Sequence, residues 1–410
     1  MTNVVGIIGE YNPFHNGHKY HLEKSKQEAR ADYVINVISG NFVQRGNVSL
    51  LDKWSKADMA LTNGADLVIE LPTIYSISSA ENFAYGAVKI LNSLNIVDYI
   101  SFGSESCDLE ILEKCADILY KQPSEFVSLL KHELSSGVSF PKARENALLM
   151  YLNDIRKYAN VLSSPNNILA IEYMKALKKL RSKIKPISIK RINVGYNDLE
   201  IKNNFASATA IREKIISNKP AGLSKLMPPN SYRILYNSIQ KGHYVKDITA
   251  FEKEIIYTLR KMSLNEIANL PDVSEGLEHN IKNAANSCNT ISEFMNIIKT
   301  KRYTNTRIQR ILLYALLGIT KKDMQDSFKA QPYIRVLGFN DKGKALLSAI
   351  SRANPNLNII TSVKKYMDSN PNKTLLNMLN TDINATNIYT LGYEKDSWSN
   401  LDFTHNMIIY

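Results

Sequence analysis

The chain has 410 residues, of which 44% are hydrophobic and 22% charged, as in a soluble globular protein with a sizeable core and two or three domains. Its three cysteines form no Cys-x-x-Cys pair, no apolar run approaches the ~18 residues of a membrane span, and no signal peptide is evident, so we expect a cytoplasmic protein with no membrane partner. The net charge of +12 points to an anionic partner.

The first element expected is a buried parallel strand over Val4 to Ile8, a continuous run of mostly β-branched residues with one glycine. A turn at Asn12-Pro13-Phe14 follows, and His15-Asn16-Gly17-His18 then leads into a segment with helical character. The order strand, tight turn, helix predicts the first unit of a doubly wound α/β sheet. Such sheets bind ligands at the carboxyl ends of their strands.

The two histidines at this helix start are the first candidate catalytic residues. A helix N-terminus offers unpaired N–H groups and a positive partial charge to a phosphate. His15 and His18 are three residues apart and share one helix face, and Gly17 lets a ligand approach the backbone closely. Two imidazoles placed there can donate hydrogen bonds to an α-phosphate as charge builds on its oxygens. The alternative is two solvent-facing histidines at an ordinary helix start.

Three further strands and their loops complete the predicted nucleotide-binding sheet. We expect strands over Tyr33–Ser39, Ala65–Leu71 and Val97–Phe102, with amphipathic helices between them. Gly103 follows the last of these strands, where adenine or ribose can lie against the backbone. Arg45, in a loop at a strand's carboxyl end, and Lys53, at a helix start, are candidates to contact phosphate or an acyl group. Surface charge explains both equally well.

A second signature, Ser207-x-Thr209-x-x-Arg212, stands ahead of a helix. Hydroxyls and a helix start bind phosphate, and an arginine adds a bidentate charge. An ordinary capped helix with an exposed arginine is the alternative. Between the two signatures lies a basic run, Lys175 to Arg191, with eight basic residues and no acidic one, for which a solvated helix face is the usual explanation. Another helix start, near 166–167, could be capped by either asparagine.

Beyond the second signature we predict a nucleotide-binding domain over 1–225, a helical region over 226–328 and a small α/β module over 329–410. Residues 1–110 carry a net charge of −5, so the whole basic excess, +17, lies beyond them. This split suits a polyanion that reaches across a second region. A basic cluster with an interleaved aromatic suits RNA, although a solvated helix face has the same composition: Lys299, Lys301, Arg302, Tyr303, Arg307 and Arg310.

The segment Glu10-Tyr11-Asn12-Pro13-Phe14-His15-Asn16-Gly17-His18 resembles the nucleotidyltransferases with an H-x-G-H signature, and more narrowly the bacterial tRNA(Met) cytidine acetate ligase family. The resemblance covers most of residues 1–220 and implies a Rossmann-like domain. It implies catalysis by His15 and His18, no resident metal, and a set of ATP contacts: Ile7, Ile8, Gly9, Glu10, Tyr11, Asn12, Pro13, Phe14, His15, Asn16, Gly17, His18, Lys19, Tyr20, Gly103, Asn166 or Asn167, Arg191, Ser207, Thr209 and Arg212.

The residues themselves indicate attack of a nucleophile on the α-phosphorus of ATP, with pyrophosphate as the leaving group. The resemblance implies that the nucleophile is acetate, that Mg²⁺ is carried mainly by the nucleotide, and that the acetyl group passes to the wobble cytidine of elongator tRNA(Met). Two alternatives stand beside this interpretation. An adenylyltransferase for a phosphorylated metabolite would explain both signatures but not the excess of basic residues. A nucleotide-dependent RNA-binding protein would explain the charge but gives the two histidines no role.

Overall fold

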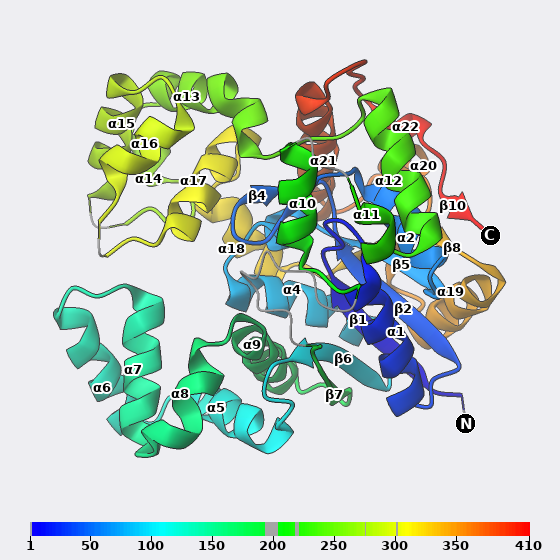
Figure 1. Ribbon diagram of the computed structural model, residues 1–410, viewed down its shortest axis with the longest axis horizontal. Coiled ribbons are helices and arrows are strands. Elements are labelled where there is room, and N and C mark those ends of the chain that lie inside the picture. The colour runs from blue at the N-terminus through cyan, green and yellow to red at the C-terminus, as the bar shows by residue number, and fades with distance from the viewer. Residues whose placement is uncertain (1, 193–203, 218–220, 275, 301) are drawn as a thin grey trace.

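The computed structural model describes residues 2–192, 204–217, 221–274, 276–300 and 302–410. One large sheet runs through this part of the chain in the order β10-β8-β5-β2-β1-β6-β7, with β9 paired to β8, and β3 and β4 form a separate hairpin (Figure 1). The strands are β1 (Val4–Gly9), β2 (Tyr33–Ser39), β3 (Phe42–Val43), β4 (Asn47–Val48), β5 (Leu67–Leu71), β6 (Tyr99–Ser104), β7 (Lys185–Lys190), β8 (Tyr333–Phe339), β9 (Asn358–Ile360) and β10 (Ile408–Ile409).

Helices fill most of the remaining chain. Those before residue 220 are α1 (Asn16–Glu28), α2 (Lys53–Leu61), α3 (Thr73–Ser76), α4 (Ala80–Ser93), α5 (Leu109–Lys121), α6 (Ser124–Ser135), α7 (Phe140–Leu152), α8 (Ile155–Ser163), α9 (Pro165–Lys179) and α10 (Ala208–Ile216). Those after it are α11 (Leu223–Leu226), α12 (Pro229–Lys241), η1 (Ile248–Phe251), α13 (Glu252–Lys261), α14 (Leu264–Ala268), α15 (Leu277–Ser287), α16 (Ile291–Ile298), α17 (Asn305–Leu317), α18 (Lys321–Lys329), α19 (Asp341–Ala353), α20 (Val363–Asp368), α21 (Lys373–Tyr389), η2 (Thr390–Gly392) and α22 (Leu401–Thr404). None of the helices in the described ranges has the length and apolar character to cross a bilayer.

The parallel strands β5-β2-β1-β6-β7 form the predicted Rossmann-like core. The chain runs outward from β1 through β2 to β5, then crosses back to build β6 and β7 on the other side of β1. The order therefore reverses between β1 and β6, and an open sheet binds its ligand at such a point. The H-x-G-H segment follows β1 and Gly103 lies near the end of β6, so both expected nucleotide contacts stand at this crevice.

Successive side chains of a strand point to opposite faces of the sheet, and each face has its own hydrophobic core. In β1, Val4 joins the core that includes α4 and α9, whereas Val5 and Ile7 join the core that includes α2 and α10. Gly6 lies directly beneath α4, and a Cβ added there would come within 2.8 Å of the methyl groups of Leu91. A larger residue in the first strand would therefore make the Leu91 side chain of α4 shift.

The C-terminal strands extend this same sheet, which differs from the separate α/β module that we expected for 329–410. Strand β8 pairs antiparallel with β5, and β9 and β10 pair parallel with β8. From Tyr333 to Gly338 every residue of β8 is buried. A strand covered on both faces needs a large sheet and helices on both sides, which a small module would not provide.

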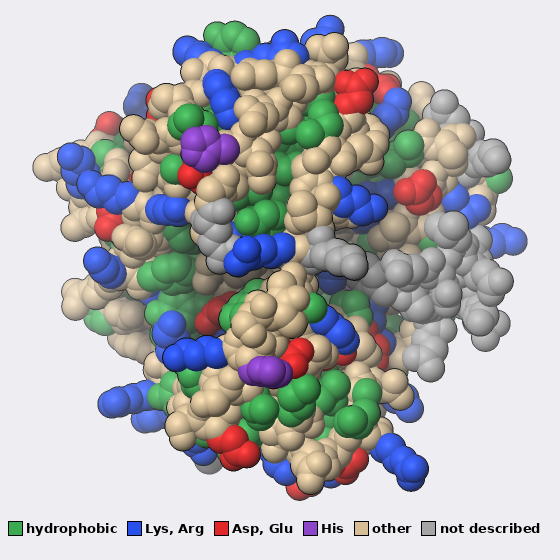
Figure 2. Space-filling model, turned by 90° about the vertical axis from the view of Figure 1, so that its left-hand side faces the viewer, with side chains coloured by type: hydrophobic (Ala, Val, Ile, Leu, Met, Phe, Trp, Pro, Cys, Tyr) green, Lys and Arg blue, Asp and Glu red, His purple; other side chains and the backbone are tan. Residues whose placement is uncertain are grey.

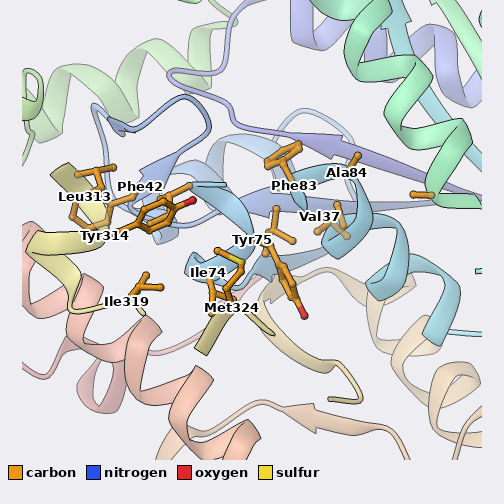
Figure 3. Packing of buried hydrophobic residues seen from close by; sticks show 14 of the residues in the cluster. Val37, Phe42, Ile74, Tyr75, Phe83, Ala84, Leu313, Tyr314, Ile319 and Met324 are labelled. Carbon is orange, nitrogen blue, oxygen red and sulfur yellow. The ribbon is translucent and has the colours of Figure 1, made fainter. Parts of the chain in front are cut away.

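The helical region shares its core with the sheet. Figure 3 shows Leu313 and Tyr314 of α17 beside Phe42, and Met324 near Ile74 and Tyr75. The Tyr75 hydroxyl also donates to a backbone carbonyl of α18 at 2.6 Å. These contacts fix α17 and α18 against the nucleotide-binding core, so the basic cluster at the start of α17 is held at a defined place relative to the sheet.

Candidate active site

The H-x-G-H segment builds the start of α1 from its own histidines. His15 is the N-cap residue, and its Nδ1 accepts the Gly17 N–H at 3.0 Å. The Nδ1 of His18 accepts the His15 N–H at 3.3 Å, so the two side chains form a reciprocal capping box. Their rings stack with centroids 3.8 Å apart. The alternative of two solvent-facing histidines does not hold, because His15 is buried and both line a cavity.

These hydrogen bonds decide which ring nitrogen carries the proton. An Nδ1 that accepts an N–H cannot itself be protonated, so each neutral ring carries its hydrogen on Nε2. Burial, with Arg191 and Arg212 nearby, lowers the pKa of His15 to about 3. Burial and the neighbouring His15 lower the pKa of His18 well below its usual value. The motif thus holds two neutral Nε2–H donors, which suits them to hydrogen-bond a phosphate oxygen.

This arrangement predicts that the histidines of α1 do not titrate near neutral pH. Burial and Arg191 lower the pKa of a third histidine, His21, to about 4. Imidazole NMR signals of His15, His18 and His21 in the free protein should not shift between pH 8 and pH 5. In the unfolded chain the three histidines take up protons below pH ~6.5. The free energy of unfolding should therefore fall as the pH drops below that value. A midpoint near 6.5 for His15 or His18 would contradict the lowered pKa values that burial gives these rings.

The second signature lies against the first. Ser207 is the N-cap of α10, and its hydroxyl accepts the Ala210 N–H at 3.1 Å. Arg212 is not an exposed surface residue: it donates to the Asn12 carbonyl at 2.7 Å and to the Thr209 hydroxyl at 3.1 Å. A helix start, a hydroxyl and a guanidinium therefore face the same crevice as the histidines, a combination suited to a polyphosphate.

The structure distinguishes the two asparagines that the sequence could not. Asn167 is buried, and its Oδ1 accepts the N–H groups of Glu105 and Ser106 at 3.0 and 3.2 Å, which holds the loop after β6. Asn166 lines the cavity, where its Oδ1 accepts from Arg191 at 3.4 Å. The Arg191 side chain lies over Gly103, whose added Cβ would be 3.2 Å from the Arg191 Cγ. Asn166 is therefore the better candidate for a ligand contact.

Most of the expected ATP contacts line one cavity of about 1120 Å³ at the sheet's reversal point. Those that line it are Ile7, Ile8, Gly9, Glu10, Tyr11, Asn12, His15, Gly17, His18, Tyr20, Gly103, Asn166, Arg191, Ser207, Thr209 and Arg212. Five others, Pro13, Phe14, Asn16, Lys19 and Asn167, do not line it. Phe14 is fully buried, the Asn16 amide donates to the Lys225 carbonyl at 2.9 Å, and Lys19 pairs with Glu23 on the surface.

The remaining cavity walls come from two helical parts far apart in the sequence, which we call the α7 wall and the α17 wall. The α7 wall contains Ser139, Phe140, Pro141, Lys142, Arg144, Glu145 and Leu148. The α17 wall contains Asp272, Arg302, Thr304, Thr306, Arg307, Gln309 and Arg310. Figure 2 shows this face as a hollow band between an upper and a lower lobe, with Lys and Arg side chains along it. The volume lies slightly above the ~300–1,000 Å³ of ordinary small-molecule pockets.

The basic cluster is placed at the α17 wall, although not as a free helix face. Helix α17 begins at Asn305, so Lys299 and Arg302 lie in the exposed segment before it. Arg307 donates to the Asp272 carbonyl at 2.9 and 2.7 Å, and Arg310 pairs with the Asp272 carboxylate at 2.7 Å. The predicted RNA contact Lys301 lies outside the described residues.

Two lysines near the site have roles that the sequence did not reveal. Lys53 does not contact the cavity: it is fully buried and pairs with Glu70 at 3.0 Å and Asp402 at 2.7 Å. Lys56, which the sequence pattern did not single out, is also fully buried and donates to the carbonyls of Gly40 at 2.6 Å, Ser39 at 2.8 Å and Glu10 at 3.2 Å. It ties together the carboxyl ends of β1 and β2. Both lie in α2, where lysine normally indicates an exposed face.

The part of the cavity lined by His15, His18 and Arg212 is called the nucleotide end. The β3–β4 hairpin joins this end of the cavity to the α17 wall. At one end, the Gln44 N–H donates to the Glu10 carboxylate at 2.6 Å. Burial raises the pKa of Glu10, against the effects of this hydrogen bond and of Lys56. At the other end, Gly46 has φ +73° and packs so closely on α17 that an added Cβ would lie 2.4 Å from the Arg310 nitrogen. Arg45 lies between these anchors and lines the cavity.

No cluster of three or more His, Cys, Asp or Glu suited to a metal ion is found among the described residues. The donors that line the nucleotide end are mostly imidazoles, hydroxyls and guanidinium groups, which suit phosphate oxygens rather than Mg²⁺. The residues present therefore do not form a protein cage for a divalent cation.

Comparison with known proteins agrees with this geometry. Residues 2–402 match the family described as HIGH Nucleotidyl Transferase. The tRNA(Met) cytidine acetate ligases of Thermoanaerobacter sp. (strain X514) and Clostridium tetani are 48% and 45% identical, covering 99% and 96% of both chains. The crystal structures of Thermotoga maritima TmcAL, one apo and one bound with alpha-thio ATP, are 33% identical with TM-scores of 0.95 and 0.93, and each covers 100% of this chain and 99% of the other. The chain therefore belongs to the HIGH nucleotidyltransferase family and, within it, to the tRNA(Met) cytidine acetate ligases.

Proposed function

We propose that this protein is a cytoplasmic ligase that activates acetate with ATP and transfers the acetyl group to the wobble cytidine of elongator tRNA(Met). The observation that carries the proposal is one cavity with two different ends. Its inner end holds two neutral Nε2–H donors beside Arg191 and Arg212, and its outer end opens between two helical walls with basic side chains. The identity to relatives named for this reaction supports the same conclusion.

In the first step, an acetate oxygen attacks the α-phosphorus of ATP and pyrophosphate leaves, which yields acetyl-adenylate. The Nε2–H groups of His15 and His18 donate to the α-phosphate oxygens, where charge increases in the transition state. Ser207, Thr209 and Arg212 hold the departing pyrophosphate, while Gly103, Asn166 and Arg191 line the place for the nucleoside. Mg²⁺ enters with the nucleotide as part of the substrate, held by its phosphates.

In the second step, the exocyclic amine of the cytidine attacks the acetyl carbonyl. A C–N bond forms, the C–O bond to phosphate breaks, AMP leaves and the amine loses one proton. Acetyl-adenylate is a mixed anhydride and is sufficiently activated to react without an acyl-enzyme intermediate. The cytidine must be unstacked to enter the cavity, as is usual for sequence-specific recognition of RNA loops.

The test of this proposal is acetylation of defined transcripts with ATP and radiolabelled acetate. The label should appear on elongator tRNA(Met) and disappear when its wobble cytidine is replaced by uridine. An adenylyltransferase would instead attach AMP to a phosphorylated metabolite, and an RNA-binding protein would bind the transcript without labelling it. Either result would contradict the proposed activity.

The α17 wall gives a separate prediction about RNA binding. Lys299 and Arg302 are exposed in the segment before α17, so replacing them leaves the contacts of Arg307 and Arg310 with Asp272 intact. The double variant Lys299→Ala, Arg302→Ala should reduce the magnitude of the salt slope of tRNA binding by about 1.4–1.8, because each phosphate that is no longer neutralised lowers it by about 0.7–0.9.

Two measurements check this prediction: tRNA affinity across a salt series, and pyrophosphate exchange without tRNA. The exchange rate should stay unchanged, because neither residue belongs to the nucleotide end. An unchanged slope would place the RNA elsewhere. The basic run from Lys175 is the weaker alternative, since Lys175 pairs with Glu172 at 2.6 Å and Lys178 with Asp117 at 2.6 Å.

A further inference from the structure

The α7 wall carries an aromatic side chain that is not packed in the hydrophobic core. Phe140 is 51% exposed although phenylalanine is among the residues most often buried. Its neighbour in the same lobe, Phe126, behaves as expected: it is buried and packs edge-on against Tyr151. Phe140 instead lines the active-site cavity, and it is the aromatic residue of the described chain that both lines this cavity and is more than one-third exposed.

Other exposed aromatic residues do not share this position. Tyr120, Tyr257 and Trp398 are 45%, 65% and 47% exposed, and none of them lines the cavity. Scattered exposed aromatics need no explanation, whereas one that faces a large cavity marks a place where a flat ligand can bind. Phe140 lines the cavity from the α7 wall, whereas His15 and Arg212 line it from the sheet and from α10.

The charges around this ring suit a nucleic acid. Lys142, two residues on, has a side chain that is 54% exposed, and it also pairs with Glu145 at 3.0 Å on the surface. On the facing α17 wall, Arg302 is exposed and lines the same cavity. An aromatic ring flanked by cations on both sides of a groove is the arrangement that proteins use for unstacked bases and their phosphates.

We infer that Phe140 stacks against an unstacked base of the tRNA anticodon loop, next to the cytidine that is acetylated, and that Lys142 contacts a neighbouring phosphate. This inference rests on the proposed function, because it names how that function's RNA substrate is held. Stacking on Phe140 keeps the loop open while the reacting cytidine enters the inner cavity. The ring thereby fixes the position of the RNA without touching ATP or acetate.

The test compares Phe140→Ala with Phe140→Tyr and with Tyr120→Ala, a matched exposed aromatic outside the cavity. Removing one base–aromatic stack should weaken tRNA binding by about 5- to 150-fold. Stacking releases no counterions, so the log–log salt plot of Phe140→Ala should lie parallel to that of the wild type. Lys142→Ala should instead flatten the slope by about 0.7–0.9. Phe140→Tyr keeps the ring and should bind nearly as well as the wild type, and Tyr120→Ala should bind like the wild type.

Acetyl-adenylate formation without tRNA provides the internal control. It should be unchanged in Phe140→Ala, since an exposed ring contributes little to the fold. The inference is overturned if Phe140→Ala binds tRNA within twofold of the wild type, or if its loss of binding is matched by an equal loss of adenylate formation. If the wild-type protein itself acetylates no tRNA, the proposed function fails instead, and the two failures are distinguished by the wild-type assay.

Discussion

Replacing His18 by Ala should slow acetyl-adenylate formation by roughly 100- to 1,000-fold, the effect of losing one donor to a developing oxyanion. The His18 ring is neutral and its Nδ1 is occupied by the His15 N–H, so its Nε2–H is the group left to bind an α-phosphate oxygen. Because this bond strengthens as charge develops, ATP affinity should change far less than the rate. Pyrophosphate exchange with acetate gives the rate, and equilibrium dialysis gives the affinity.

The control must separate catalysis from the capping role of the same side chain. His18→Asn keeps an acceptor for the His15 N–H near the Nδ1 position but has no donor at the Nε2 position, so it should keep the capping role and remain nearly as slow as His18→Ala. His18→Asp keeps only the acceptor and adds a negative charge, and it should be as slow as His18→Ala. Equal losses of rate and ATP affinity in His18→Ala would mean that His18 merely holds ground-state ATP.

Replacing Lys53 by Met should lower the free energy of unfolding by about 3–5 kcal/mol, the usual result of removing one partner of a buried ion pair. Lys53 is fully buried between Glu70 of β5 and Asp402 of α22, and Arg335 of β8 also lies within 3.4 Å of Asp402. Burial opposes the charge of Lys53, but Asp402 and Glu70 raise its pKa. Without the ammonium group, two carboxylates would remain buried with less compensation, and α22 would lose one of its contacts with α2.

Urea unfolding followed by circular dichroism measures this destabilisation. Lys121→Met is the matched control, because Lys121 pairs with Asp117 at 3.2 Å on the surface with 65% of its side chain exposed. Exposed pairs contribute about 0–1 kcal/mol, so the control should remain close to the wild type. A decrease below about 1 kcal/mol for Lys53→Met would show that the buried cluster does not stabilise the fold in this way.

The sequence was informative where local chemistry decides the structure. An apolar strand, a turn and a histidine-capped helix are encoded within about twenty residues, and the structure has them where the pattern predicts. The same holds for the strands ending at Ser39 and Leu71, which Gly40 and Pro72 follow directly, whereas Gly103 lies within β6, which continues to Ser104. Ser207 could be foreseen as a cap, but the approach of its helix to Asn12 depends on folding across about 200 residues.

Features that depend on distant partners could not be foreseen. Lys53 and Lys56 occur in a pattern typical of an exposed helix face, yet carboxylates and carbonyls from other elements neutralise them in the interior. Strand β8 was expected as part of a small module, but its partner β5 lies more than 250 residues earlier in the chain.

Formation of acetyl-adenylate from acetate and ATP at the nucleotide end of the cavity can be measured directly. Purified protein is incubated with labelled acetate and MgATP without tRNA, and the bound small molecules are separated after rapid quenching. We expect acetyl-adenylate on the wild-type protein and little of it on His18→Ala. If acetate yields no adenylate and AMP is transferred only to a phosphate ester, the protein is an adenylyltransferase and the proposed activity is contradicted.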